Sequence, residues 1–123
     1  MLSNARLIGF VPTRNADRAR DFYESALGLR FLKDDTFALI MQSGESTVRI
    51  VRVGEFQPFP FTLLGWDVSD IDAAVADLSG RGVQFQRYGF LEQSPAGIWT
   101  APGAVKVAWF QDPDGNTLSI SQH

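Results

Sequence analysis

The fold is decided by the stretch TRNADRARDFYESALGLRF at residues 13–31, because its pattern returns as VSDIDAAVADLSGRGVQF at residues 68–85. Asn15 aligns with Asp70, and both are residue types that favour the N-cap of a helix. Behind each cap, small and apolar residues recur at steps of three and four until a glycine ends the pattern. The chain therefore contains an internal repeat of about 55 residues, with too few copies for a solenoid.

Strand patterns surround the two helices in the same order. Around the first helix, apolar or alternating stretches predict strands at residues 5–12, 29–33, 36–42 and 46–53. Around the second helix they predict strands at residues 61–68, 83–88, 104–111 and 117–122, while 97–101 fits either a strand or a loop. Two facing βαβββ units in an α+β fold follow from this order.

The two units are expected to form a single domain that spans residues 1–123. The first module covers about residues 5–53 and the second about residues 61–122. Between them, residues 54–60 contain one glycine and two prolines, which break the strand pattern and predict a linker.

Composition excludes several classes of function. Eleven basic and 14 acidic residues give a net charge of −3, and no Lys/Arg cluster follows a phosphate backbone, so nucleic acid is not an expected partner. With no cysteine, the chain has no disulfide and no thiolate ligand. We expect no membrane segment and a cytoplasmic location, since no long apolar run or secretion signal is present. The 15 aromatic residues fit a sheet-rich core or, alternatively, a lined apolar cavity.

Three motifs carry a family resemblance. The stretches FVPTRNADRARDFYESALGLRF, DVSDIDAAVADLSGRGVQF and VAWFQDPDGNTLSIS stand in order along the chain. They resemble the two module starts and the closing hairpin of the vicinal oxygen chelate superfamily. This superfamily includes glyoxalases, extradiol dioxygenases, fosfomycin-modifying enzymes and bleomycin-resistance proteins. The resemblance implies curled mixed sheets that form a cup, and it leaves the chemistry to be read from the site itself.

Metal enzymes of this superfamily place ligands on the first and last strands of the modules. Carried over to this sequence, those positions are Ile8, Leu63, Arg49 and Ser119. None of them offers a carboxylate or an imidazole, the side chains that zinc, nickel, iron and manganese require. We therefore expect a member without metal or other cofactor, and we do not expect metal-dependent catalysis. The single histidine, His123, is the last residue and a poor catalytic candidate.

The closing stretch also contains paired carboxylates, Asp112 and Asp114, in the sequence Asp-Pro-Asp-Gly-Asn. Proline and glycine stand where a tight turn needs them. We interpret the two carboxylates as acceptors for local backbone N–H groups, so they fold the hairpin and take no part in chemistry.

Strand alternation gives the candidate ligand-binding residues. They are Ile8, Phe10, Leu63, Asp67 and Ser119, with Arg49 opposite and Trp99 as an aromatic wall. Arg49 suits an anionic group, or else it pairs with Asp67, which is itself a possible general base. Trp66 and Trp109 are expected in the core. Residues 88–97 are a possible lid, or else a surface connection whose aromatic side chains pack back on the sheet.

Two function hypotheses remain open on the sequence. The first is a metal-independent protein that binds an aromatic or amphipathic small molecule and forms a homodimer, as short members of the superfamily commonly do. The second is a glyoxalase-type lyase or isomerase with a metal-free site, using Asp67 or Glu92 as base. A purely structural partner domain is a third possibility, suggested only by the phenylalanines of residues 55–61. No catalytic residue is assigned.

Overall fold

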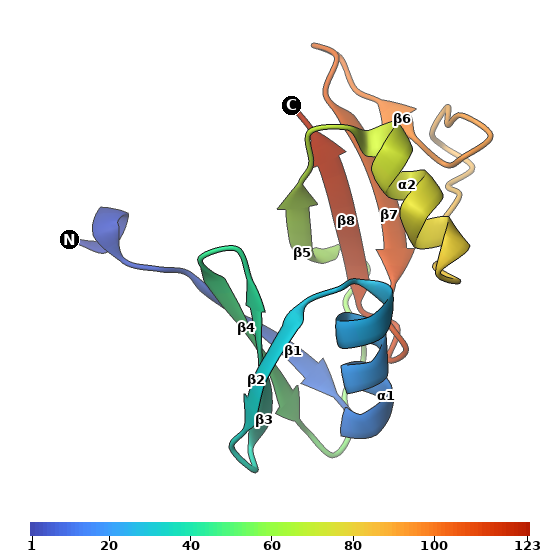
Figure 1. Ribbon diagram of the computed structural model, residues 1–123. Helices are drawn as coiled ribbons and strands as arrows, with labels where there is room; N and C mark the ends of the chain where they lie inside the picture. Colours follow the sequence, from blue (N-terminus) through green and yellow to red (C-terminus); the bar gives the residue numbers. More distant parts are fainter. The chain divides into compact units, whose positions relative to one another are not determined.

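The computed structural model describes residues 1–123, which form two compact units, Met1–Gln57 and Pro58–His123. The boundary between the units lies within residues 54–60, where the linker is predicted. Each unit has a four-stranded mixed sheet and a helix (Figure 1). The predicted α+β fold with a βαβββ order in each module is confirmed.

Unit 1 begins with a short 3-10 turn, Leu2–Asn4, followed by β1 (Ile8–Thr13), α1 (Ala16–Arg20), β2 (Arg30–Asp34), β3 (Ala38–Ser43) and β4 (Ser46–Arg52). The strand order is β1-β4-β3-β2, with β1 parallel to β4 and the other pairs antiparallel. Asn15 caps α1 as predicted, because its side chain accepts a hydrogen bond from the backbone N–H of Arg18. The helix continues as a π-helical segment, Asp21–Ala26, which the sequence pattern does not distinguish from α-helix.

One face of the first sheet supplies the core of unit 1. Side chains on alternate strand positions are buried there with side chains from the helix, among them Val11, Leu39, Met41, Ile50, Ala19 and Tyr23. The neighbouring strand positions point to the opposite face, where Ile8 and Phe10 remain more than half exposed. This face, away from the helix, carries Ile8, Phe10 and Arg49, the residues of unit 1 that are predicted to bind a ligand.

Unit 2 contains β5 (Thr62–Asp67), α2 (Ile71–Gly80), β6 (Trp99–Thr100), β7 (Lys106–Gln111) and β8 (Thr117–Gln122). The strand order is β5-β8-β7-β6, with β5 parallel to β8, so the sheet repeats the topology of unit 1. Asp70 caps α2 by accepting a hydrogen bond from the backbone N–H of Ala73. The two caps therefore hold equivalent places in the repeat.

The strand predicted at residues 83–88 is wrong. Only a single bridge forms there, between Phe85 and Phe110, and the two-residue strand β6 comes from the segment predicted as strand or loop. Both segments pair with β7: residues 85–86 contact residues 109–110, and β6 pairs with Lys106 and Val107. Because they share this strand, neither segment can extend along all of it.

The closing turn folds the last hairpin as predicted. One oxygen of the buried Asp112 carboxylate accepts hydrogen bonds from the backbone N–H groups of Asp114 and Asn116, each at 2.9 Å. The other oxygen accepts one from the Asn116 side-chain amide, also at 2.9 Å. These bonds fix the turn between β7 and β8.

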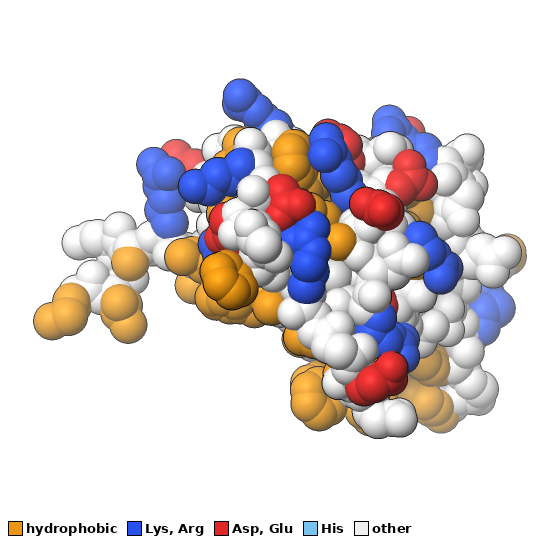
Figure 2. Space-filling model, turned by 90° about the horizontal axis from the view of Figure 1, so that it is seen from below, with side chains coloured by type: hydrophobic (Ala, Val, Ile, Leu, Met, Phe, Trp, Pro, Cys, Tyr) orange, Lys and Arg blue, Asp and Glu red, His pale blue; other side chains and the backbone are white.

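The surface carries charges of both signs. On the face drawn in Figure 2, Lys and Arg side chains lie next to Asp and Glu side chains, and hydrophobic side chains appear between them. None of the helices is long and apolar enough to cross a membrane.

Candidate functional site

Equivalent rows of residues cross the two sheets. In unit 1, Arg49 on β4 pairs in register with Phe10 on β1 and with Ile40 on β3. In unit 2, Ser119 on β8 pairs with Gly65 on β5 and with Trp109 on β7. Arg49 and Ser119 thus hold corresponding positions, as the sequence comparison of the modules predicts. Since paired residues share a face, each row lies on the side of its sheet away from the buried core.

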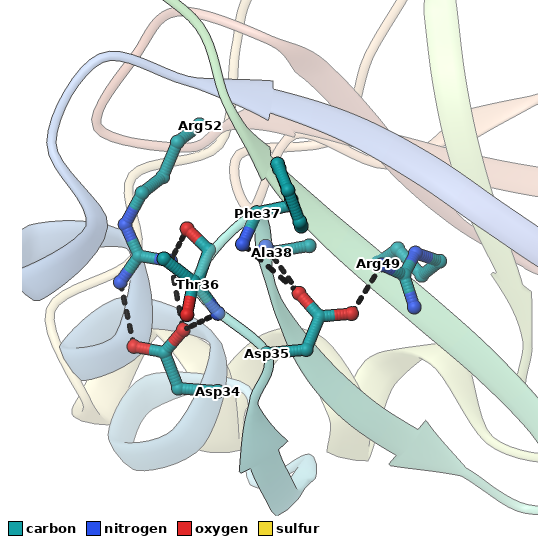
Figure 3. A network of polar contacts seen from close by, with 7 residues as sticks. All are labelled: Asp34, Asp35, Thr36, Phe37, Ala38, Arg49 and Arg52. Atoms are coloured by element: carbon teal, nitrogen blue, oxygen red, sulfur yellow. Dashed lines mark hydrogen bonds and ion pairs between the residues drawn. The ribbon is translucent and has the colours of Figure 1, made fainter.

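In unit 1 the central residue of this row, Arg49, forms an ion pair. The Arg49 guanidinium donates to the carboxylate of Asp35 at 2.6 Å, and both side chains are 27% exposed (Figure 3). Asp35 also accepts hydrogen bonds from the backbone N–H groups of Phe37 and Ala38. The bond from Arg49, followed by that from the Ala38 N–H, lowers the pKa of the Asp35 carboxyl.

The sequence offered Asp67 as one possible ion-pair partner of Arg49, whereas the partner found within unit 1 is Asp35. Asp35 follows β2 directly, and the turn places its carboxylate against the Arg49 guanidinium. Arg49 therefore meets its counter-charge within unit 1.

A second ion pair stands beside it. Arg52 forms a fork with both carboxylate oxygens of Asp34, at 2.8 and 2.7 Å, and also donates to the Thr36 carbonyl (Figure 3). The hydrogen bond from Arg52 is the largest cause that lowers the pKa of Asp34 to about 2. The two ion pairs together hold the turn between β2 and β3.

In unit 2 the corresponding face carries an aromatic wall, made of Trp99, Trp109 and Tyr88. The ring centroids of Trp99 and Trp109 lie 6.0 Å apart, and Tyr88 packs edge-on against Trp109 at 5.5 Å. All three side chains are half-buried. Burial raises the pKa of the Tyr88 phenol above its usual value of 10.0. Such a wall suits stacking with a planar molecule.

The prediction that Trp109 lies in the core is wrong. The residue lies on the Ser119 face of the sheet. Its indole nitrogen donates to the Thr62 hydroxyl at 3.2 Å. Because β8 lies between β7 and β5, the indole must cross β8 to make this bond. Thr117 and Ser119, on the strand that the indole crosses, are 7% and 8% exposed.

Side-chain hydrogen bonds hold the loop of residues 88–97, which is predicted as a possible lid. The side chain of Gln93 donates to the carbonyls of Gln86 and Gly97 and accepts from the Tyr88 N–H. Arg87 donates to the carbonyls of residues 93–95. Tyr88 packs back on the sheet, whereas Phe90 remains 84% exposed. The loop thus serves to hold Tyr88 against Trp109.

The other predicted residues lie as follows. Leu63 falls at a register shift in β5, so alternation does not fix the direction of its side chain. Asp67 pairs with Ser121, whose hydroxyl lies 3.0 Å from a ring nitrogen of His123. Trp66 pairs with Ile120 on the helix-facing side of the sheet, in line with the predicted core position.

The resemblance assigns four residues to the metal-ligand positions of the superfamily. Ile8 and Leu63 have hydrocarbon side chains, Arg49 is cationic and Ser119 offers only a hydroxyl. No group of three or more His, Asp or Glu side chains in the chain is placed to hold a metal. Divalent transition metals need imidazole, carboxylate or thiolate ligands, which this set lacks.

Comparison with known proteins places this geometry in a family. Residues 7–120 match the sequence profile of the Glyoxalase/Bleomycin resistance protein/Dioxygenase superfamily. No curated protein matches the sequence closely. Several solved structures share the fold at low identity, and the three described next cover almost all of the chain.

A Bacillus anthracis protein described as a member of the glyoxalase family has a TM-score of 0.78 at 17% identity, covering 98% of this chain and 95% of its own. A superfamily member from Sphaerobacter thermophilus has a TM-score of 0.75 at 21% identity, with 100% of both chains covered. TnmS3, an antibiotic binding protein from Streptomyces sp. CB03234, has a TM-score of 0.71 at 24% identity, covering 99% and 98%. With the profile match over nearly its full length, the chain belongs to the Glyoxalase/Bleomycin resistance protein/Dioxygenase superfamily.

Proposed function

We propose that the protein binds a planar aromatic or amphipathic small molecule against the aromatic wall of unit 2, without a metal ion. The observation that carries this proposal is the contact of Trp99 and Tyr88 with Trp109 on the sheet face that also holds Ser119. Three half-buried aromatic rings on the face away from the core offer a broad apolar surface. Planar ligands gain both burial and ring stacking there.

The charges favour a ligand that is neutral or cationic. Arg49, the cation that suggested an anionic ligand, is already paired with Asp35. On the aromatic face, Asp67 lies two residues beyond Gly65 and carries a carboxylate with an exposed environment. The chain as a whole has a net charge of −3, which also attracts cations. Of the other predicted contacts, Leu63 lies in unit 2 and would supply apolar surface to this site. Ile8 and Phe10 lie in unit 1 and stay predictions.

A binding role is in keeping with one of the structural neighbours. TnmS3 is an antibiotic binding protein and shares the fold along nearly the whole chain. At 24% identity this likeness supports the fold and offers binding as one use of it. The ligand class proposed for this protein rests on its own aromatic wall.

The test compares the same substitution on the two faces of one sheet. Trp99→Leu removes a ring from the wall, whereas Trp66→Leu removes one from the helix-facing side. Binding of trimethyl(naphthalen-1-ylmethyl)ammonium, naphthalene-1-methanol and naphthalene-1-methanesulfonate is measured by isothermal titration calorimetry, at temperatures below the melting transition of every variant.

We expect the cation and the neutral alcohol to bind the native protein, and the sulfonate to bind more weakly. Trp99→Leu should weaken binding of the cation about tenfold, because one stacking surface is lost, and Trp66→Leu should change it less than twofold. Equal loss in both variants, or no binding of any of the three compounds, contradicts the proposal.

The metal-free part of the proposal is tested by native mass spectrometry of the purified protein. Its support is the set of side chains at the family's ligand positions, Ile8, Leu63, Arg49 and Ser119. A stoichiometric metal adduct would contradict it and would favour the alternative, a glyoxalase-type lyase or isomerase. In a metal-free form that enzyme would need Asp67 or Glu92 as base, and both side chains are exposed.

The same spectrum counts subunits. We infer a homodimer and a cytoplasmic location, the first from the habit of short members of the superfamily and the second from the sequence. Exposed apolar side chains on the face of sheet 1 away from the helix, such as Ile8 and Phe10, would suit burial in a dimer. A monomer at micromolar concentration contradicts the first inference, and recovery in a membrane or secreted fraction contradicts the second.

A further inference from the structure

Gly65 stands in the middle of a strand without a backbone reason for glycine. Its φ is not in the left-handed region, whereas the turn glycines Gly28 and Gly115 have φ values of 75° and 89°. A glycine inside a strand loses conformational entropy and offers no side chain to pack. Such a position often marks a place where another group must approach the backbone closely.

The group that approaches Gly65 is the hydroxyl of Ser119. A Cβ built on Gly65 would lie 2.8 Å from Ser119 Oγ, closer than real Cβ contacts allow. The Ser119 hydroxyl therefore leans toward β5, into the volume that any other residue at position 65 would fill. Gly65 itself is exposed, while its strand neighbours Leu64 and Trp66 are half-buried.

The Ser119 hydroxyl is nearly buried and yet takes no partner from the protein. The residue is 8% exposed, and its side chain forms no hydrogen bond within the chain. All fully sealed side-chain oxygens do have partners, so this hydroxyl keeps an opening to solvent. Since its Oγ leans toward the exposed Gly65, that opening lies over the glycine.

The neighbouring polar group on this face is already engaged. The Trp109 indole nitrogen donates to the hydroxyl of Thr62, so it does not serve a ligand without breaking that bond. The indole crosses β8 toward Thr62 at the start of β5, and Gly65 in the middle of that strand remains exposed. A flat molecule lying against the wall would therefore reach Ser119 through the space above Gly65.

We propose that Gly65 and Ser119 form a notch that receives a hydrogen-bonding group on the rim of the aromatic ligand, such as a phenolic hydroxyl or a ring carbonyl. The notch deepens the proposed function and rests on it, since the ring system is held by the aromatic wall. The Ser119 hydroxyl can donate a hydrogen bond to an oxygen of the ligand or accept a hydrogen bond from a ligand hydroxyl. A nearly buried hydroxyl left without a partner disfavours a bare hydrocarbon.

The experiment measures selectivity between two ligands that differ only at the rim. One is trimethyl(naphthalen-1-ylmethyl)ammonium. The other carries one additional ring hydroxyl, and among the positional isomers of this derivative we take the one that the native protein binds most tightly. The ratio of their dissociation constants is obtained by calorimetry for the native protein and for Ser119→Ala, Gly65→Ala and the double variant. Ser121→Ala is the matched control, on the same strand and face but with its hydroxyl near His123.

We expect the native protein to favour the hydroxylated cation, and Ser119→Ala to reduce this preference five- to tenfold. Gly65→Ala fills the notch and should abolish the preference. Gly65→Ala should also lower stability, because the new Cβ would lie 2.8 Å from Ser119 Oγ. The double variant lacks this contact, so its stability should return to the native value while the preference for the hydroxylated cation stays lost. That result separates occupation of the notch from damage to the fold. Ser121→Ala should leave the ratio unchanged within twofold.

The outcomes distinguish the two proposals. If both cations bind and Ser119→Ala retains the native ratio, the notch is refuted and the aromatic binding function stands. A double variant that regains the native preference also refutes the notch. If neither cation binds the native protein, the binding function fails and the notch falls with it.

Discussion

Asp112→Ala should destabilise unit 2 strongly, because one buried carboxylate serves three donors. The side chain is 5% exposed and accepts bonds from the Asp114 N–H, the Asn116 N–H and the Asn116 amide, each at 2.9 Å. A buried donor that loses its acceptor costs about 1 kcal/mol or more, so three of them correspond to a loss of about 3 kcal/mol. We expect the free energy of unfolding to fall by that amount, with an unchanged denaturant slope.

Tryptophan fluorescence in urea is a suitable assay, since all three tryptophans of the chain, Trp66, Trp99 and Trp109, lie in unit 2. The signal therefore follows this unit without interference from unit 1. A loss below about 1 kcal/mol with an unchanged slope would refute the reasoning, because the three bonds would then be replaced by water at little cost.

A double-mutant cycle isolates the side-chain bond within this turn. Asp112→Asn keeps an oxygen for the two backbone donors but places an amide against the amide of Asn116. Asn116→Asp in the same chain restores one donor and one acceptor, with the polarity reversed. We expect a favourable coupling of about 1 kcal/mol between the two substitutions. Strict additivity would mean that the contact between these side chains contributes nothing.

Three further predictions concern the turns and caps. Arg52→Gln should raise the pKa of Asp34 from about 2 toward its usual value of 3.8, as read by carboxyl NMR titration. Because the pKa of Asp34 is lowered in the folded protein, the stability from this ion pair is present above pH 3.8 and is lost as the pH falls toward 2. The unfolding free energies of the native protein and the variant should therefore converge in acid. A difference that stays constant with pH contradicts this. Asp70→Ala should cost about 1 kcal/mol in urea unfolding, because the Ala73 N–H loses its cap, whereas Asp70→Asn should cost less. Gly28→Ala should cost about 1 kcal/mol by circular dichroism because φ is 75°, while Gly80→Ala, in α2 with open space around it, should cost nothing; equal effects of the two would contradict the conformational argument.

Local chemistry made much of the fold predictable. Asn15 and Asp70 are found as N-caps because their side chains bond within three residues, a distance that sequence spacing describes. The Asp112 turn is found for the same reason. The position of Ser119 on the face away from the helix also follows, since strand alternation places it there.

The errors occur where sequence pattern carries no direction. Val107, Ala108, Trp109 and Phe110 are consecutive apolar residues in β7, so alternation does not say which of them face the helix. Trp109 was therefore expected in the core, although it lies on the Ser119 face. The pairing of Arg49 with Asp35 depends on where a turn places one carboxylate, and the division of β7 between two short partners depends on competition for one strand. Neither is visible from spacing.

The two equivalent rows explain why we place binding in unit 2. Unit 1 has Phe10, Arg49 and Ile40 where unit 2 has Gly65, Ser119 and Trp109. In the first row the polar centre is satisfied by Asp35 at 2.6 Å, so a ligand that used Arg49 would have to compete with that carboxylate. In the second row the polar centre has no partner in the protein, a glycine leaves it accessible, and a tryptophan lies beside it. A ligand therefore gains a hydrogen bond and a stacking surface at the second row without displacing any group of the protein, whereas at the first row an anionic ligand would share Arg49 with the carboxylate of Asp35.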